Sequence, residues 1–384
     1  MGSMNLQWCW FFVFASCLGA CSPSSAQSPN SALSVGNVIA VNPVTDRIYT
    51  GNETLPYVTV IDGATNESTK IAVGGTPAQI VVNAATNRIY VGLLESIGPK
   101  SGVTVIDGAT NQTTRVAVGA STYGLAVNTA TNEVYVANYY GGKITVIDGA
   151  TNRTHAIQAG LNPADLAVNP LTNRIYVANW NSAELTVIDG STNTKMSVPI
   201  RGKSEQHSIA VNTLTNKIYV GSDVESKTVT LIDGLTNQTT AIATAGYVSG
   251  LAINPASNKV YVVNPYNGRL SVIDGATNQV TTIAVGQNPT SIAVDPANNK
   301  IYVAHSGLCE GVTVLDGATG DMSRIKGGTY LQSVAVNPIT HKVYAYDPEA
   351  VIVFDPATNK STDVVLPLPF SLPRYVAHCA SNQR

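Results

Sequence analysis

The chain has 384 residues, of which 44% are hydrophobic and 12% charged, and its formal net charge at pH 7 is −2. Its length and apolar content allow a large core, and all-β folds of this size often form one domain. The near-neutral charge, with no Lys/Arg-rich run, excludes a strong general attraction to nucleic-acid phosphates. Val, Ile and Tyr recur throughout, which excludes a disordered chain.

Residues 1–26 are predicted to be a secretory leader. Residues 8–20 form an apolar run that is too short to span a bilayer, although no Lys or Arg precedes it as in most leaders. The sequence Leu18-Gly19-Ala20-Cys21 resembles a bacterial lipobox, which predicts acylation of Cys21. Ordinary cleavage after Ala26 is the alternative. Residues 27–34 are then a linker, and residues 35–384 form one folded unit.

Two sequence landmarks repeat along this unit with a period of about 42 residues, the length of a four-stranded propeller blade. An apolar-Tyr pair recurs at Tyr49, Tyr90, Tyr135, Tyr176, Tyr219, Tyr261, Tyr302 and Tyr344. An apolar-Asp-Gly step recurs at Asp62, Asp107, Asp148, Asp189, Asp233, Asp274 and Asp316, with Asp355-Pro356 as a divergent eighth copy. Internal repetition of this kind predicts a repeat architecture.

Each repeat divides into four short extended runs, for example residues 291–295, 300–304, 311–316 and 322–326. Pro, Asn, Asp and Gly separate the runs at hairpin spacing. The predicted fold is an all-β propeller of eight four-stranded antiparallel blades, and seven blades with an accessory repeat is the alternative. Residues 31–36 resemble a spare fourth strand and residues 373–384 a spare first strand, so we expect one terminal strand to complete the ring or cover its outside.

The runs Ile175-Tyr176-Val177-Ala178-Asn179 and Val-Ile-Asp-Gly-Ala-Thr-Asn resemble the YVTN β-propeller repeat family. That family includes YncE-like periplasmic proteins and archaeal surface-layer proteins, and the resemblance covers residues 35–366. It implies an exported propeller, in a family whose members are mostly non-catalytic or unassigned and some of which are thought to bind single-stranded DNA. Known relatives often have seven blades, whereas this chain carries eight copies.

The connections between strands differ in how much they vary. Those after the first and third strands are nearly constant, and backbone needs explain their residues, because Asn and Asp bond their own chain and Gly accepts positive φ. The repeated Asp and Tyr residues are therefore predicted to be structural. The connections after the second and fourth strands vary and share one face of a propeller, which predicts a contact surface there.

The candidate ligand-binding residues lie on this variable face. Aligning the first strands gives an outer ring (Asn37, Ala78, Tyr123, Ala164, His207, Ser249, Thr290 and Gln332) and an inner ring (Val38, Gln79, Gly124, Asp165, Ser208, Gly250, Ser291 and Ser333). Variable loops add Tyr139, Tyr140, Lys143, Trp180, Arg201, Lys203, Tyr266 and Arg269. Aromatic side chains beside Arg and Lys can stack on bases or sugars or anchor a protein.

The sequence contains no motif typical of a metal or cofactor site. The five histidines are scattered, and no His-Glu-x-x-His or Cys-x-x-Cys pattern occurs. Outside the leader only Cys309 and Cys379 remain, and whether they pair is open.

We expect a monomeric, non-catalytic binding or scaffold propeller without cofactor or metal, whose ligand is a protein, a glycan or single-stranded nucleic acid. It would meet a membrane only through a lipid anchor at Cys21. A propeller enzyme of the lyase or lactonase type, using Asp165 and His207, and a surface-layer or adhesive component are the alternatives.

Overall fold

The computed structural model of the chain describes residues 38–52, 55–94, 102–119, 121–180, 182–201, 208–222, 226–307 and 310–366. The predicted leader with Cys21, the linker 27–34 and the predicted extra strand 373–384 lie outside these ranges. So do Lys203, His207, Cys309 and Cys379. The predictions for these segments and residues therefore stay predictions.

The described residues form eight four-stranded antiparallel sheets, each made of consecutive strands. The first four blades are β1–β4 (Ile39–Asn42, Arg47–Gly51, Tyr57–Asp62, Ser68–Ala72), β5–β8 (Pro77–Asn83, Arg88–Leu93, Gly102–Asp107, Thr113–Val116), β9–β12 (Thr122–Asn128, Glu133–Asn138, Lys143–Asp148, Thr154–Gln158) and β13–β16 (Pro163–Asn169, Arg174–Asn179, Glu184–Asp189, Lys195–Pro199). The other four are β17–β20 (Ile209–Asn212, Lys217–Gly221, Thr228–Asp233, Thr239–Ala243), β21–β24 (Gly250–Asn254, Lys259–Asn264, Arg269–Asp274, Val280–Ala284), β25–β28 (Pro289–Asp295, Lys300–His305, Val312–Asp316, Met322–Ile325) and β29–β32 (Ser333–Val336, Val343–Asp347, Ala350–Asp355, Lys360–Val365).

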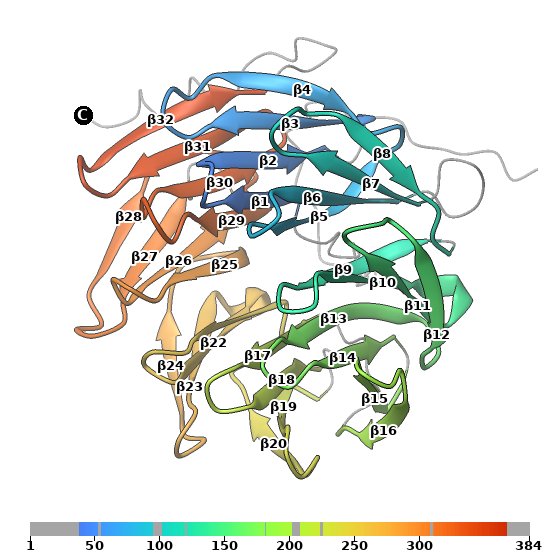
Figure 1. Ribbon diagram of the computed structural model, residues 1–384. Coiled ribbons are helices and arrows are strands. Elements are labelled where there is room, and N and C mark those ends of the chain that lie inside the picture. The colour runs from blue at the N-terminus through green and yellow to red at the C-terminus, as the bar shows by residue number, and fades with distance from the viewer. Residues whose placement is uncertain are drawn as a thin grey trace, which may run out of the picture. The chain divides into compact units, whose positions relative to one another are not determined.

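The chain is an eight-bladed β-propeller, so the all-β prediction is confirmed and the seven-blade alternative is wrong. Each blade's first strand contacts the next blade's first strand, and β1 contacts β29 to close the ring. Figure 1 shows the first blade beside the last. Within the described residues no strand of either terminal blade joins the sheet of the other, because both blades are complete by themselves.

The hydrophobic core is divided into eight clusters, one between each pair of neighbouring blades. Blades 1 and 2, for example, share Tyr49, Val58, Ile80 and Val91. All eight repeated Tyr side chains are at most 2% exposed. Their repetition reflects the filling of equivalent gaps between blades, in agreement with the structural role predicted for them.

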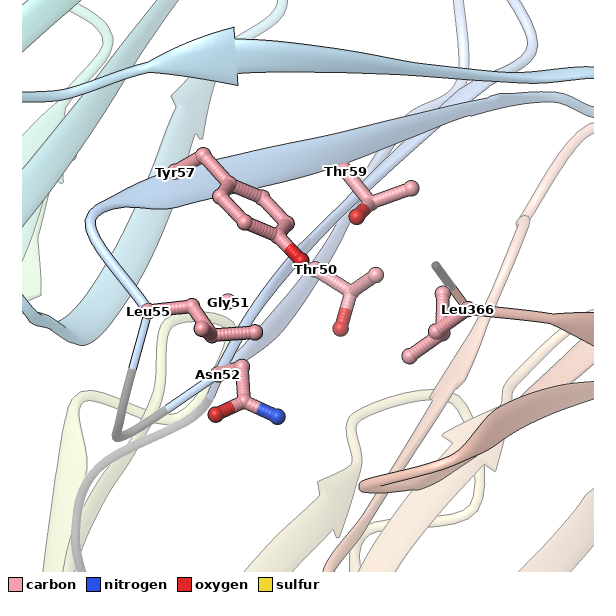
Figure 2. A pocket seen from close by; sticks show the side chains of 7 residues that line it. All are labelled: Thr50, Gly51, Asn52, Leu55, Tyr57, Thr59 and Leu366. Carbon is pink, nitrogen blue, oxygen red and sulfur yellow. The ribbon is translucent and has the colours of Figure 1, made fainter. Parts of the chain in front are cut away.

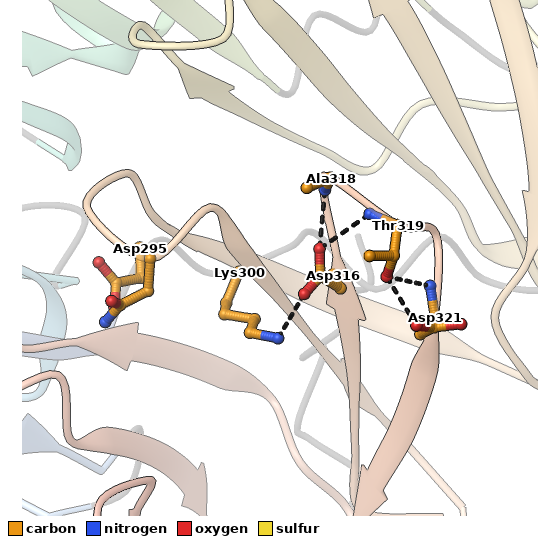
Figure 3. Close-up of polar contacts among 7 residues, drawn as sticks. Asp295, Lys300, Asp316, Ala318, Thr319 and Asp321 are labelled. Carbon is orange, nitrogen blue, oxygen red and sulfur yellow. Dashed lines mark hydrogen bonds and ion pairs between the residues drawn. The ribbon is translucent and has the colours of Figure 1, made fainter.

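The repeated Asp residues hold the turn between the third and fourth strands. In blade 7 the Asp316 Oδ1 accepts hydrogen bonds from the backbone amides of Ala318 and Thr319, at 2.8 and 3.0 Å (Figure 3). The Lys300 ammonium lies 2.7 Å from Asp316 Oδ2. Lys300 and the two turn amides hold the pKa of the Asp316 carboxyl well below its ordinary value. The structural reading of these acids is thus confirmed.

A ring of side-chain hydrogen bonds joins every blade to the next. The residue that ends each first strand, or in blade 8 directly follows it, is 0% exposed and bonds a residue in the following blade's first turn, at 2.7–2.9 Å. The pairs are Asn42–Asn87, Asn83–Asn132, Asn128–Asn173, Asn169–Asn216, Asn212–Asn258, Asn254–Asn299, Asp295–His341 and Asn337–Asp46. In seven pairs the first residue donates from Nδ2, whereas Asp295 accepts from His341.

The same turns supply a second link between blades. Each partner residue has a left-handed backbone, with φ between 48° and 60°, and Asn87 accepts at its carbonyl the amide of Gly108. A side chain at Gly108 would collide with Asn87, which explains why Gly follows Asp. The Gly108 carbonyl oxygen accepts a hydrogen bond from the Arg47 guanidinium of the preceding blade. Equivalent bonds run from Arg174, Lys217, Lys259 and Lys342 to Gly234, Gly275, Gly317 and Gly63.

Asn212→Ala removes the side-chain bond between blades 5 and 6 and leaves the half-buried Asn258 Oδ1 without this donor. We expect the free energy of unfolding to fall by about 1–3 kcal/mol, the usual result of leaving a buried polar group unsatisfied. Urea unfolding followed by tryptophan fluorescence measures the change. The control is Leu214→Ala, two residues along the same turn, where the side chain is 70% exposed. Equal unfolding midpoints for the two variants would contradict the role of the link.

Candidate binding surface on the variable face

Four first strands carry an irregularity where they reach the variable face. The register shifts by one residue near the start of β5, β9, β13 and β25. The extra residues are Ala78, Ala164 and Thr290, and in β9 one of Tyr123 and Gly124. A β-bulge of this kind turns a side chain out of the regular strand. The bulged positions therefore coincide with members of the outer ring predicted from the sequence.

The structure brings four of the predicted residues together in an aromatic cluster, comprising Tyr123, Tyr139, Tyr140 and Trp180. The Tyr139 ring stacks on Tyr123, with 4.5 Å between centroids and 25° between planes. Tyr140 and Trp180 meet Tyr139 edge-on, at 5.1 and 6.4 Å. Tyr140 is 66% exposed, and the other three are half-buried. The cluster spans blades 3 and 4 and presents one ring to solvent.

A short 3-10 turn, η1 (Tyr139–Gly141), positions two of these rings. The turn ends at Gly142, whose φ of 58° favours glycine. Asn138, just before the turn, is 1% exposed and accepts at Oδ1 a 2.6 Å bond from Thr145 of β11. This buried bond ties the exposed turn to the blade. Burial also raises the pKa of Tyr123 and Tyr139, so both hydroxyls stay neutral at physiological pH.

Asp165 lies beside the cluster on the first strand of blade 4. A β-carbon placed on Gly124 would lie 3.1 Å from the Asp165 Cα, so the two strands are in close contact. Burial raises the pKa of the half-buried Asp165 carboxyl to about 6, although the amides of Leu166 and Ile209 bond it. An acid that titrates near pH 6 can donate or accept a hydrogen bond in a near-neutral solution.

A second aromatic pair lies on blade 6, three blades further around the ring. Tyr266, in the 3-10 turn η2 (Pro265–Asn267), is 69% exposed and meets Tyr247 at 5.5 Å. Arg269 follows at the exposed start of β23. Sequence reasoning selected Tyr266 and Arg269 and missed Tyr247. The available signal was an aromatic residue in a connection between a fourth and a first strand.

The predicted residues Arg201 and Gln332 belong to neither of these two groups. Arg201 is exposed after β16, and Gln332 is exposed before β29. Lys203 and His207 lie outside the described residues, so the predicted pair of Asp165 and His207 cannot be placed. Gln79, a member of the predicted inner ring, accepts at its side-chain oxygen a hydrogen bond from the Leu125 backbone amide of the next blade.

His305 is a structural residue in the described part of the chain. It is 0% exposed, and its ring nitrogens bond the Gln287 carbonyl and the Thr313 hydroxyl at 2.8 and 2.9 Å. Burial lowers its pKa, which favours a neutral ring. Within the described ranges, no group of three or more His, Cys, Asp or Glu side chains is suited to hold a metal. No helix among these residues is long and apolar enough to cross a membrane.

A small pocket lies between blade 1 and the end of blade 8 (Figure 2). Its lining is Thr50, Gly51, Asn52, Leu55, Tyr57, Thr59 and Leu366. The interior has room for about one water molecule, which suits the buried Thr50 hydroxyl. The pocket is therefore not a ligand site of useful size.

No family model and no curated protein matches the chain. Solved structures match its fold. A structure titled Kuenenia stuttgartiensis hydrazine synthase is 19% identical with a TM-score of 0.59, covering 76% of this chain and 95% of that one. A crystal structure of the mitotic checkpoint complex is 12% identical with a TM-score of 0.60, covering 76% and 96%. At these identities the likeness shows the propeller fold alone.

Asp165→Asn is expected to make stability less sensitive to pH. The folded-state pKa of about 6 exceeds the ordinary 3.8, so the wild type loses stability as pH rises from 4 through 6. Asn keeps an acceptor oxygen without the charge. Thermal unfolding from pH 4 to 8 should give a higher melting temperature for the variant at pH 7.5 and no difference at pH 4. The control is Glu184→Gln, an exposed acid on β15, and a pH-independent difference at Asp165 would contradict the assignment.

Proposed function

We propose that the chain is an exported, non-catalytic binding propeller of the YVTN-repeat type that recognises its ligand with the aromatic cluster on the variable face. The observation that carries this proposal is the meeting of Tyr123, Tyr139, Tyr140 and Trp180 across two blades. The repeated residue pattern supports the family, and the pattern of residues 1–26 supports export.

The physical argument for binding rests on what the exposed rings gain by being covered. Aromatic side chains bury a large area and lose little conformational entropy, which is why they dominate binding energetics. Tyr140 is 66% exposed, whereas all eight repeated Tyr side chains are buried between blades. Rings held outward by a buried anchor at Asn138 are preorganised for contact, which lowers the entropic cost of association.

The first test is thermal unfolding of the purified full chain with a panel of proteins, glycans and oligonucleotides. A ligand of the native state must raise the melting temperature, by an amount set by its concentration relative to Kd. We expect at least one ligand to do so, and the shift to fall by more than half in the Tyr140→Ala/Trp180→Ala double variant. The matched control is Tyr330→Ala, a tyrosine 59% exposed before β29 on the same face. A shift that persists in the double variant would overturn the proposed site.

Export is tested by the mass of the mature N-terminus from a secreting bacterial host. A diacylated Cys21 is expected if the lipobox is used, and Cys21→Ser should then abolish the lipid mass and membrane fractionation. A mature chain that begins at Gln27 supports export by ordinary cleavage instead. Recovery of the uncleaved chain in the cytoplasm would contradict export in either form.

A further inference from the structure

Blades 3 and 6 display the same exposed unit. In each, a 3-10 turn after the second strand ends at a left-handed glycine, Gly142 or Gly268, with φ of 58° or 63°. Each turn carries a highly exposed tyrosine, Tyr140 or Tyr266, at 66% or 69%. These are the two 3-10 turns among the described residues.

The two units also share their anchor and their neighbours. Asn264 is 0% exposed and accepts a 2.7 Å bond from Ser271, as Asn138 does from Thr145. Each turn is followed at once by an exposed basic residue, Lys143 or Arg269, at the start of the third strand. A second tyrosine ring contacts each turn, Tyr123 from the start of β9 in blade 3 and Tyr247 from the connection before β21 in blade 6.

The Asn anchor alone is a structural feature, because blade 4 uses it without this turn. There Asn179 donates to Thr186 at 2.9 Å, and the connection continues as Trp180 to Ala183 without a left-handed glycine. Blades 3 and 6 therefore share three features beyond the Asn anchor: the exposed tyrosine, the left-handed glycine and the basic residue. Two copies of this addition on one face point to two equivalent contacts with one ligand.

Among the described residues at the connections from second to third strands, three bases, Lys143, Lys227 and Arg269, stand against three acids, Glu184, Glu310 and Glu349. Arg324 of β28 forms an ion pair with Glu310. A polyanion would need an excess of cations along its path, since phosphate neutralisation dominates such binding. A neutral ligand with many hydroxyl groups fits this mixture of donors and acceptors better.

We propose that Tyr140 and Tyr266 are two subsites for one neutral polysaccharide chain. Each exposed ring covers the C–H face of a sugar ring, while Lys143 or Arg269 donates to sugar hydroxyls. At the first subsite, Asp165 can also accept a hydrogen bond from a sugar hydroxyl when ionised or donate one when protonated. This inference rests on the proposed binding function and names the ligand class of its site.

The spacing of the subsites explains why the ligand is a polymer. Blades 3 and 6 are separated by two intervening blades, so one sugar unit cannot contact both tyrosines. A chain that reaches both makes its second contact intramolecularly, which raises affinity well above that of either subsite. Removing one tyrosine should therefore weaken polymer binding far more than binding of a short oligosaccharide.

The test is binding of the full chain to an array of neutral polysaccharides, anionic polysaccharides and single-stranded oligonucleotides. We expect retention by at least one neutral polysaccharide, with little change between 50 and 500 mM salt. Tyr140→Ala and Tyr266→Ala should each weaken that binding about tenfold or more, and the double variant should abolish it. A short oligosaccharide of the same sugar should lose only part of its binding in either single variant. Tyr330→Ala is the matched control, and unchanged melting temperatures show that the variants fold.

Two results would overturn the inference. One is binding to anionic polymers or oligonucleotides alone, with a steep loss at higher salt; if that binding still depends on Tyr140, the proposed function stands and the neutral glycan fails. The other is neutral-polysaccharide binding that is unchanged in the double variant. Failure of every ligand on the array to respond to any aromatic variant would remove both the inference and the proposed function.

Discussion

The propeller depends on one hydrogen bond that is repeated around the ring. A buried side chain at the end of each first strand bonds a left-handed residue in the next blade's first turn, as Asn128 bonds Asn173 at 2.7 Å. In blades 1 to 7 the left-handed residue leaves no space for a β-carbon on the Gly after the repeated Asp, and in five of these blades the Gly carbonyl accepts a bond from an Arg or Lys of the preceding blade. Each bond is worth about 0.5–1.5 kcal/mol. Because eight such bonds form a closed ring, a displacement of one blade would have to break its bonds to both neighbouring blades.

This constraint accounts for the difference between the two faces. Asn, Asp and Gly are tied to the junctions at the turns after the first and third strands, so those turns cannot change freely. Among the described residues, the connections on the opposite face carry no repeated side-chain pair of this kind, and they hold the bulges, the 3-10 turns and the exposed rings. The junction of blades 7 and 8 shows the chemical requirement directly, because Asp295 and His341 exchange the roles of acceptor and donor and keep a 2.8 Å bond.

Much of the fold could be predicted from the sequence, because the period and the Asp-Gly step mark each blade. The sequence explained the constant Asn residues only by hydrogen bonds within their own turns. It could not reveal their hydrogen bonds to the next blade, because a turn motif describes a single chain segment. Tyr123, Tyr139 and Trp180 could be chosen because strand alignment placed them on one face. Tyr247 was missed because it precedes its strand at a position where the other blades have no common residue.

The rigidity of the ring also bears on recognition. The anchors of Tyr140 and Tyr266 are bonds to buried residues of their own blades, and those blades are fixed by the junction bonds. The backbones of the two turns are therefore anchored at positions that the ring of blades fixes. A flexible ligand loses conformational entropy to reach both turns, whereas a stiff chain whose units already match their separation loses little. A pair of anchored turns thus selects a polymer by its repeat and stiffness as well as by the chemistry of one unit.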